Sequence, residues 1–139
     1  MAMQRTQNCG TAWVLLCLAL ALHVIDEAAN DFLSLYNPTV HAIRERISWL
    51  PIPTFTFRTW ITLLAAGIVC LLALSPFAYR GSRWLRPFAY FYAIAMTANG
   101  LQHIVGSVYL HRFAPGVYSS PILIAAAVNL LLALLRTRR

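Results

Sequence analysis

Acidic residues are scarce in this sequence, and lysine is absent. The 139 residues include four acidic side chains against eleven basic ones, all arginine, for a net charge of +7. Charged residues make up 11% of the chain and hydrophobic residues 60%, whereas soluble domains average about a quarter charged and about half apolar. A chain of this length cannot enclose so much apolar surface in its own core. The composition argues against an ordinary soluble domain and predicts a membrane protein.

Cysteine pairs and basic stripes are also lacking. Cys9, Cys17 and Cys70 form no CxxC pair, and two of them lie in apolar runs. Neither a disulfide framework nor a cysteine zinc site is therefore predicted. No basic stripe with interleaved aromatic residues is present, so nucleic acid is not an expected partner. The arginines instead flank apolar runs, as they do in membrane proteins.

Long apolar runs are what the sequence has instead. They occupy about residues 11–29, 59–77, 87–110 and 117–135. Each run is close to the roughly 20 residues with which a helix crosses a hydrocarbon core. Helices also satisfy their backbone groups without water. We therefore predict an all-α fold, an integral membrane four-helix bundle that forms a single domain over residues 1–139.

The first run also fits a secretory signal peptide, because Arg5 precedes an apolar stretch that contains Ala19-Leu20-Ala21. Cleavage there would leave His23 and its polar neighbours at a new N-terminus. Those polar residues continue the helical spacing, which favours a retained span. Both alternatives stay open at this point.

The segment between the first two runs shows the pattern of an amphipathic helix. Apolar residues recur there at spacings of three and four: Val40, Ile43, Ile47 and Leu50. Pro38 can open such a helix at its first turn, and Pro51 ends it. The pattern predicts an interfacial helix over about residues 38–50. A surface helix packed on the bundle would give the same pattern.

The distribution of arginine predicts an orientation. Four crossings place both chain ends and the middle connection on one side, with seven arginines: Arg5, Arg80, Arg83, Arg86, Arg136, Arg138 and Arg139. The other side has four: Arg44, Arg46, Arg58 and Arg112. Positive loops stay in the cytoplasm, so we expect a multi-pass protein with both termini cytoplasmic.

Three of the four acidic residues follow one another closely at the end of the first run, around the stretch HVIDEAAN. At about 100° per residue, four polar side chains share one stripe of a helix: His23, Asp26, Glu27 and Asn30. The third run places Asn99 and His103 one helical turn apart. Both runs cross in the same direction, so the two groups lie at the same depth. Ionisable residues inside membranes face a partner or a cavity, so a shared intramembrane site is predicted.

Two histidines with a carboxylate are a ligand set for zinc, iron or manganese. We expect His23, Glu27 and His103 to be the metal ligands, with Asp26 behind them or acting as general base. Without a metal, Glu27 and His103 would form an acid–base pair, so the candidate catalytic residues are Asp26, Glu27 and His103. A polar network that only fixes helix packing is the competing interpretation.

Further polar residues are expected around this site. Asn30 and Asn99 are supporting candidates. Arg112, in the short loop after the third run, either neutralises a phosphate or carboxylate of the substrate or simply flanks the membrane. Ser119 and Ser120 have no base nearby in the sequence, so no serine hydrolase triad is predicted.

The stretches HVIDE and NGLQHIVGSVYLHRFAPG resemble the HXXEE-domain family of small integral membrane proteins. The resemblance covers most of the chain and maps the family's motif to His23, Asp26, Glu27 and His103. It also implies a characteristic arginine, for which Arg112 is the best match and Arg44 or Arg46 an alternative. Asp26 replaces a glutamate and is one methylene shorter, so direct ligation is less secure for Asp26 than for Glu27. The resemblance implies a shared polar site and names no reaction.

Three classes of function fit these observations. The first is a membrane-embedded enzyme, either metal-dependent or acid–base, that acts on a lipid or other apolar substrate. The second is a small proton-coupled transporter, in which the same carboxylates carry protons. The third is a structural or accessory subunit. The enzyme is favoured over a packing device, because packing needs one asparagine or serine rather than two carboxylates and two histidines.

Overall fold

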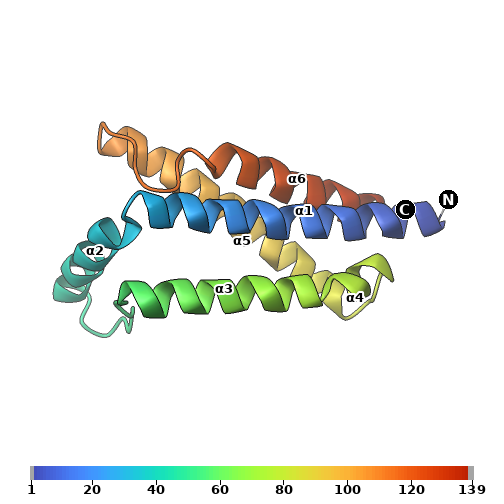
Figure 1. The fold of residues 1–139 in the computed structure, drawn as a ribbon, viewed down its shortest axis with the longest axis horizontal. Helices are drawn as coiled ribbons and strands as arrows, with labels where there is room; N and C mark the ends of the chain where they lie inside the picture. Colours follow the sequence, from blue (N-terminus) through green and yellow to red (C-terminus); the bar gives the residue numbers. More distant parts are fainter. Residues whose placement is uncertain (1, 138–139) are drawn as a thin grey trace.

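The computed structural model describes residues 2–137, and all regular structure in that part of the chain is helical (Figure 1). The helices are α1 (Ala2–Ala29), α2 (Phe32–Arg46), α3 (Phe57–Ala73), α4 (Ser75–Tyr79), α5 (Leu85–Tyr109) and α6 (Ser120–Arg136). The all-α prediction is confirmed. Three of the arginines counted in the predicted charge bias lie outside the described part: the side chain of Arg5, and Arg138 and Arg139.

The long helices alternate in direction, with α5 crossing the others obliquely, so both ends of the described chain lie at the same end of the molecule (Figure 1). Helix α6 packs against both α1 and α5, and α3 lies along α1. The short α4 sits beside the first half of α1, near the termini, and α2 lies at the opposite end. The end of α1, the end of α5 and the start of α6 are thereby brought together next to α2.

The main core lies where α1, α5 and α6 face one another. Trp13 is fully buried at its centre, and its ring packs 5.3 Å from the ring of Tyr92, centroid to centroid. The Trp13 indole N–H donates to the carbonyl of Leu71 at 2.9 Å, which ties α3 to α1. Gly100 allows α5 to approach α6, because a Cβ there would lie 2.6 Å from Ile124 Cγ1. The helices nearest the site are thus held in close contact.

Two helical stretches of the described chain, Thr6–Ala29 and Phe57–Tyr79, are long and apolar enough to cross a membrane. Helix α6 is apolar but shorter, and α5 carries Asn99, Gln102 and His103 in its second half. Length and composition therefore support two spans where four are predicted. The stretch Phe57–Tyr79 is also unusual in its exposure, since only 6% of its most apolar window is buried.

The bounds predicted for the amphipathic helix are wrong. The helix predicted at 38–50 is α2, which begins at Phe32, ends at Arg46 and carries Pro38 in its interior. Asp31, in the left-handed conformation (φ 53°), turns the chain so that α2 starts almost directly after α1. Asn37 exchanges two hydrogen bonds with the backbone of Phe55, at 2.9 and 3.1 Å. Pro38 has no N–H and cannot make its helical hydrogen bond. The contacts of Asn37 with Phe55 help to hold α2 in place all the same.

The run predicted at about 59–77 agrees with the helical stretch Phe57–Tyr79, which consists of α3 and α4. Helix α3 ends at Ala73, and α4 begins at Ser75 with Pro76 in its first turn. Pro76 lacks the N–H that would bond the Leu72 carbonyl in a continuous helix, which favours a break at this point. The chain still continues in one direction, and α4 remains packed against α1.

Candidate functional site

A buried cluster of two histidines and one carboxylate lies where α1 and α5 end. His23 and Glu27 stand one turn apart on α1, and His103 projects from α5. Their side chains are 0%, 6% and 6% exposed, respectively. One ligand atom from each residue can be chosen so that all three lie within 4.8 Å of one another. The three side chains therefore form one buried polar cluster.

His103 is the least satisfied member of the cluster. Its Nε2 lies 3.1 Å from Glu27 Oε1, while His23 Nε2 is 3.8 Å from the same oxygen. The contact with Glu27 does not have hydrogen-bond geometry, and the buried Nε2 has no hydrogen-bond partner among the described residues. Leaving such an atom unsatisfied costs about 1–3 kcal/mol, so a ligand at this position would be stabilising.

His23 is held from both sides of its ring. The amide nitrogen of Asn99 lies 3.1 Å from Nε2, and because an amide nitrogen only donates, Nε2 must accept. Gln102 donates to Asn99 Oδ1 at 2.9 Å, which fixes the orientation of that amide. The proton of a neutral His23 therefore lies on Nδ1, which donates to Ser119 Oγ at 2.8 Å. The single lone pair of Nε2 is therefore used by the Asn99 amide.

Asp26 acts on the cluster through Ser119 rather than directly. Its Oδ2 accepts from Ser119 Oγ at 2.7 Å and from Ser119 N at 2.8 Å. Asn30 Nδ2 donates to Asp26 Oδ1 at 2.8 Å. The carboxylate also faces the start of α6, where negative charge is favourable. The order Asp26–Ser119–His23 places serine in the middle, so it is not a hydrolase triad, in which histidine takes that place.

The loop between α5 and α6 closes over the two histidines. Gly116 has φ 85°, and a Cβ there would lie 2.9 Å from His103 Nδ1 and 3.0 Å from His23 Cε1. Ser120 Oγ donates to the Gly116 carbonyl at 2.7 Å and fixes this turn. Only glycine combines this conformation with such a close approach to both rings.

An apolar pocket adjoins the cluster on the side of α2 and α3. The ring of Phe32 lies 5.9 Å from that of His103 and 5.7 Å from that of Trp60, centroid to centroid. Behind it is a cavity of about 230 Å³ lined by Phe32, Tyr36, Phe55, Trp60, Leu63 and Leu64. Phe32 therefore stands between a hydrocarbon-lined space and the histidine cluster.

The structure brings together four of the residues expected from the sequence: His23, Glu27, Asn99 and His103. Asp26 and Asn30 lie on the same helix stripe but bond Ser119 and each other. Arg112 is exposed in the loop after α5. Its expected role toward a substrate stays a prediction.

Sequence reasoning missed the contributions of Ser119, Gly116 and Phe32. A usable signal existed for the first two, since the short loop after the third run must cross the same end of the bundle. Ser119 was considered only as a nucleophile and not as a link between an acid and a histidine. Phe32 gave no signal, because its approach to His103 depends on the turn at Asp31.

The residues present fit a divalent metal. Ligand atoms of a tetrahedral ion bound at about 2.0–2.2 Å lie roughly 3.5 Å apart, and the contacts of Glu27 with the two histidines, at 3.1 and 3.8 Å, are close to that spacing. The three ligand atoms lie within 4.8 Å of one another, so the side chains would have to draw together to bind an ion. The Asn99 amide must release His23 Nε2 for the ion to bind there. Ser119 and Asp26 would orient His23 from behind, as outer partners of metal-bound histidines do.

Comparison with protein-family models gives one match. Residues 14–130 match the family described as "Protein of unknown function with HXXEE motif". Searches of curated proteins and of solved structures find no significant match. The matched region contains every residue of the cluster and of the loop that covers it.

Proposed function

The chain belongs to the HXXEE family, and we propose that it is a multi-pass membrane enzyme whose buried His23, Glu27 and His103 hold a divalent metal. The metal would be zinc, iron or manganese, and the substrate a lipid or another apolar molecule. The observation that carries this proposal is the buried Nε2 of His103, which lies beside Glu27 without a hydrogen bond.

Membrane residence is supported by the exposure of α3. A core helix of a soluble protein would be mostly buried, and a signal sequence would lie near the N-terminus. The stretch Phe57–Tyr79 is internal, and only 6% of its most apolar window is buried, so neither alternative fits it. Large apolar side chains are also exposed on the other long helices: Leu18 and Ile25 on α1, Ile94 and Val105 on α5, and Ile122 and Leu132 on α6. Lipid is the solvent that such surfaces require.

The arrangement of the helices supports four crossings with both termini cytoplasmic. Both ends of the described chain lie at one end of the bundle, as an even number of crossings requires (Figure 1). Arg80, Arg83 and Arg86 lie around the turn before α5, at that same end. Helix α1 packs into the core and supplies His23 and Glu27 to the cluster. Both features support a retained first span over a cleaved signal peptide.

A bound divalent metal would supply Lewis acidity and would activate a coordinated water. The residues of the protein would hold the metal and orient its ligands. Ser119 and Asn99 fix the ring of His23, Glu27 supplies the negative charge, and Asp26 anchors Ser119. The cavity behind Phe32 would hold the hydrocarbon part of a substrate so that its polar group reaches His103. The site lies within the bundle, which limits access of bulk water.

Metal analysis of the protein purified in detergent tests the proposal. About one divalent ion per chain is expected in wild type and in Arg112→Ala, which changes an exposed residue outside the cluster. His103→Ala and Glu27→Gln should retain less than about a tenth of that amount while keeping the helical circular dichroism of wild type. A wild-type protein without stoichiometric metal, after expression with each of the three ions, would contradict the metal-dependent function.

A proton-coupled transporter is the second candidate, and the Asp26–Ser119–His23 chain favours it. This chain of hydrogen bonds connects the half-exposed carboxylate of Asp26 to the buried ring of His23. A path for protons requires such a connection between the surface and a buried group. In proteoliposomes, solute flux driven by a pH gradient and lost in Glu27→Gln would support the carrier. An acid–base enzyme without metal would instead need Glu27 and His103 for turnover and show no such flux.

A further inference from the structure

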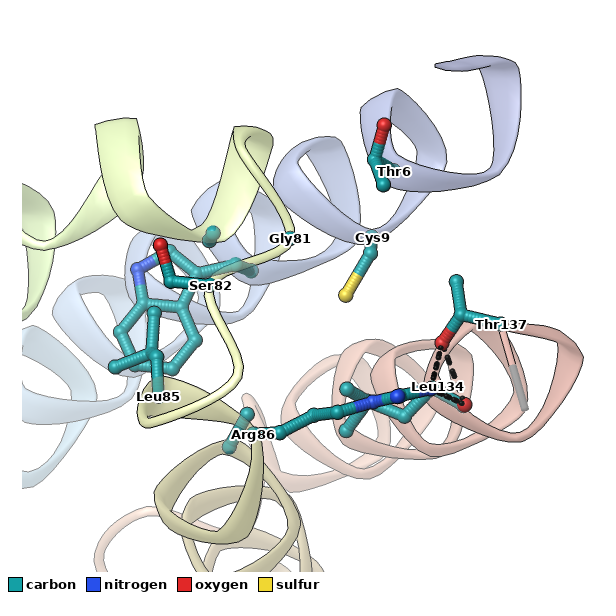
Figure 2. A pocket seen from close by; sticks show the side chains of 11 residues that line it. Thr6, Cys9, Gly81, Ser82, Leu85, Arg86, Leu134 and Thr137 are labelled. Atoms are coloured by element: carbon teal, nitrogen blue, oxygen red, sulfur yellow. Dashed lines mark hydrogen bonds between the residues drawn. The ribbon is translucent and has the colours of Figure 1, made fainter. Parts of the chain in front are cut away.

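A second cavity lies at the opposite end of the bundle, between the start of α1, the turn before α5 and the end of α6. It has a volume of about 160 Å³ and is partly open to the outside. Trp13, Leu85 and Leu134 form apolar walls, and Thr6, Ser82 and Arg86 add polar groups. Figure 2 shows the Arg86 side chain reaching from α5 across this space to the end of α6.

Arg86 is only partly satisfied in this position. Its Nη2 donates to Thr137 Oγ1 at 2.7 Å and to the Leu134 carbonyl at 3.5 Å (Figure 2). Its Nε and Nη1 make no hydrogen bond to any of the described residues. Since guanidinium carries five donors, most of them remain available to a ligand in the cavity.

The acidic side chains cannot neutralise Arg86. All four lie in the second half of α1, in the turn after it, or in α2: Asp26, Glu27, Asp31 and Glu45. That is the opposite end of the bundle from Arg86 (Figure 1). The side chain is half-buried, so solvent screens its charge only in part. No acidic side chain of the described residues lies beside Arg86, so an anionic ligand in the cavity would be favourable.

We propose that this cavity binds the phosphate of an anionic phospholipid headgroup through Arg86, with the glycerol region against Trp13 and Leu134. The inference rests on the membrane residence proposed above and is independent of the metal. Basic pockets between membrane helices bind lipid headgroups in this manner. The volume equals that of roughly five water molecules, enough for a phosphate and a few carbons. The acyl chains would then lie along the apolar outer surfaces of the helices.

Thermal unfolding in nanodiscs tests this site. The unfolding midpoint is measured in phosphatidylcholine discs with increasing fractions of phosphatidylglycerol. Wild type should be stabilised by the anionic lipid, and Arg86→Gln should need about tenfold more of it for the same shift. Ala89→Leu keeps the arginine but places a larger side chain in the lining, and it should also lose the lipid-dependent shift.

Arg83→Gln is the matched control, because it removes the same charge from an exposed position on the same turn. It should respond to phosphatidylglycerol as wild type does. Equal lipid-dependent shifts in wild type and Arg86→Gln would overturn the proposal, as would a loss in Arg83→Gln of the same size. A shift of wild type by inorganic phosphate in phosphatidylcholine discs would overturn the lipid assignment in favour of a soluble phosphate ligand. If Arg86→Gln does not fold, the comparison is made between Ala89→Leu and wild type, and equal shifts there overturn the site.

Each comparison is independent of the metal centre. The cavity and the histidine cluster lie at opposite ends of the bundle, so a wild-type protein without metal that still shows the lipid-dependent shift would separate the two proposals (Figure 1).

Discussion

His103 Nε2 on α5 lies 3.1 Å from Glu27 Oε1 on α1, and both side chains are buried. This contact joins the first and third apolar runs of the sequence and places a carboxylate inside the candidate site. A carboxylate in such a place is costly unless a positive charge or a metal accompanies it. The described residues place no arginine against Glu27, so the neighbouring histidines or a bound ion must fill that role.

Removal of metal should destabilise the wild-type protein. A ligand that binds only the folded state adds about 2.7 kcal/mol of stability at one hundred times its dissociation constant. A chelator should therefore lower the thermal unfolding midpoint of wild type in detergent by several degrees, and added metal should restore it. His103→Ala should unfold at a temperature that neither chelator nor metal changes. Chelator sensitivity in that variant would place the metal elsewhere.

Ser119→Ala should weaken metal binding without touching a ligand. The substitution removes the acceptor for His23 Nδ1 and one of the two donors to Asp26 Oδ2. Loss of such an outer partner typically lowers metal affinity about 10–100-fold. Ser120→Ala is the matched comparison, since both substitutions remove a hydrogen bond to the Gly116 carbonyl but only Ser119→Ala also removes the contacts with His23 and Asp26. Titration with a fluorescent metal indicator measures both, and equal affinities for the two variants would exclude an orienting role for Ser119.

Gly116→Ala should damage the site more than any other small substitution in the loop. A non-glycine residue at positive φ costs about 1–2 kcal/mol, and the new Cβ would press on both histidine rings. Both the unfolding midpoint and the metal content should fall. Gly106→Ala offers the comparison, because a Cβ at that helical position meets nothing within 4 Å and should be neutral or slightly stabilising. A Gly116→Ala protein with wild-type metal content would show that the loop does not control the cluster.

Much of the cluster could be predicted from the sequence because helical geometry is local. A spacing of four puts His23 and Glu27 on one face, and the shared direction of two runs puts His103 at their depth. The position of Ser119 could not be derived in this way, since it depends on the path of a loop. The start of α2 was missed for a related reason: Asp31 adopts a left-handed conformation that no periodic pattern reports. The bounds predicted for α2 were wrong because the contacts of Asn37 with the backbone of Phe55 help to hold a helix with Pro38 in its interior, and no sequence pattern reports such tertiary contacts.

Cys70 provides a direct test of where α3 lies. This cysteine is exposed on α3, whereas Cys9 and Cys17 are buried in the core. In water an exposed thiol reacts readily with maleimides, but within hydrocarbon it is inaccessible to a charged reagent and does not ionise. A variant that keeps only Cys70, made by Cys9→Ala and Cys17→Ala, should therefore resist a membrane-impermeant maleimide in intact vesicles and react after denaturation.

The matched control is Arg112→Cys, combined with Cys9→Ala, Cys17→Ala and Cys70→Ala. Residue 112 is exposed in the loop after α5, outside the apolar part of the helices. It should react with the same reagent from the non-cytoplasmic side, which also reports the orientation. If Cys70 reacts in intact vesicles as fast as the cysteine at position 112, α3 is in contact with water. The exposed apolar surface of α3 would then need a protein partner instead of lipid.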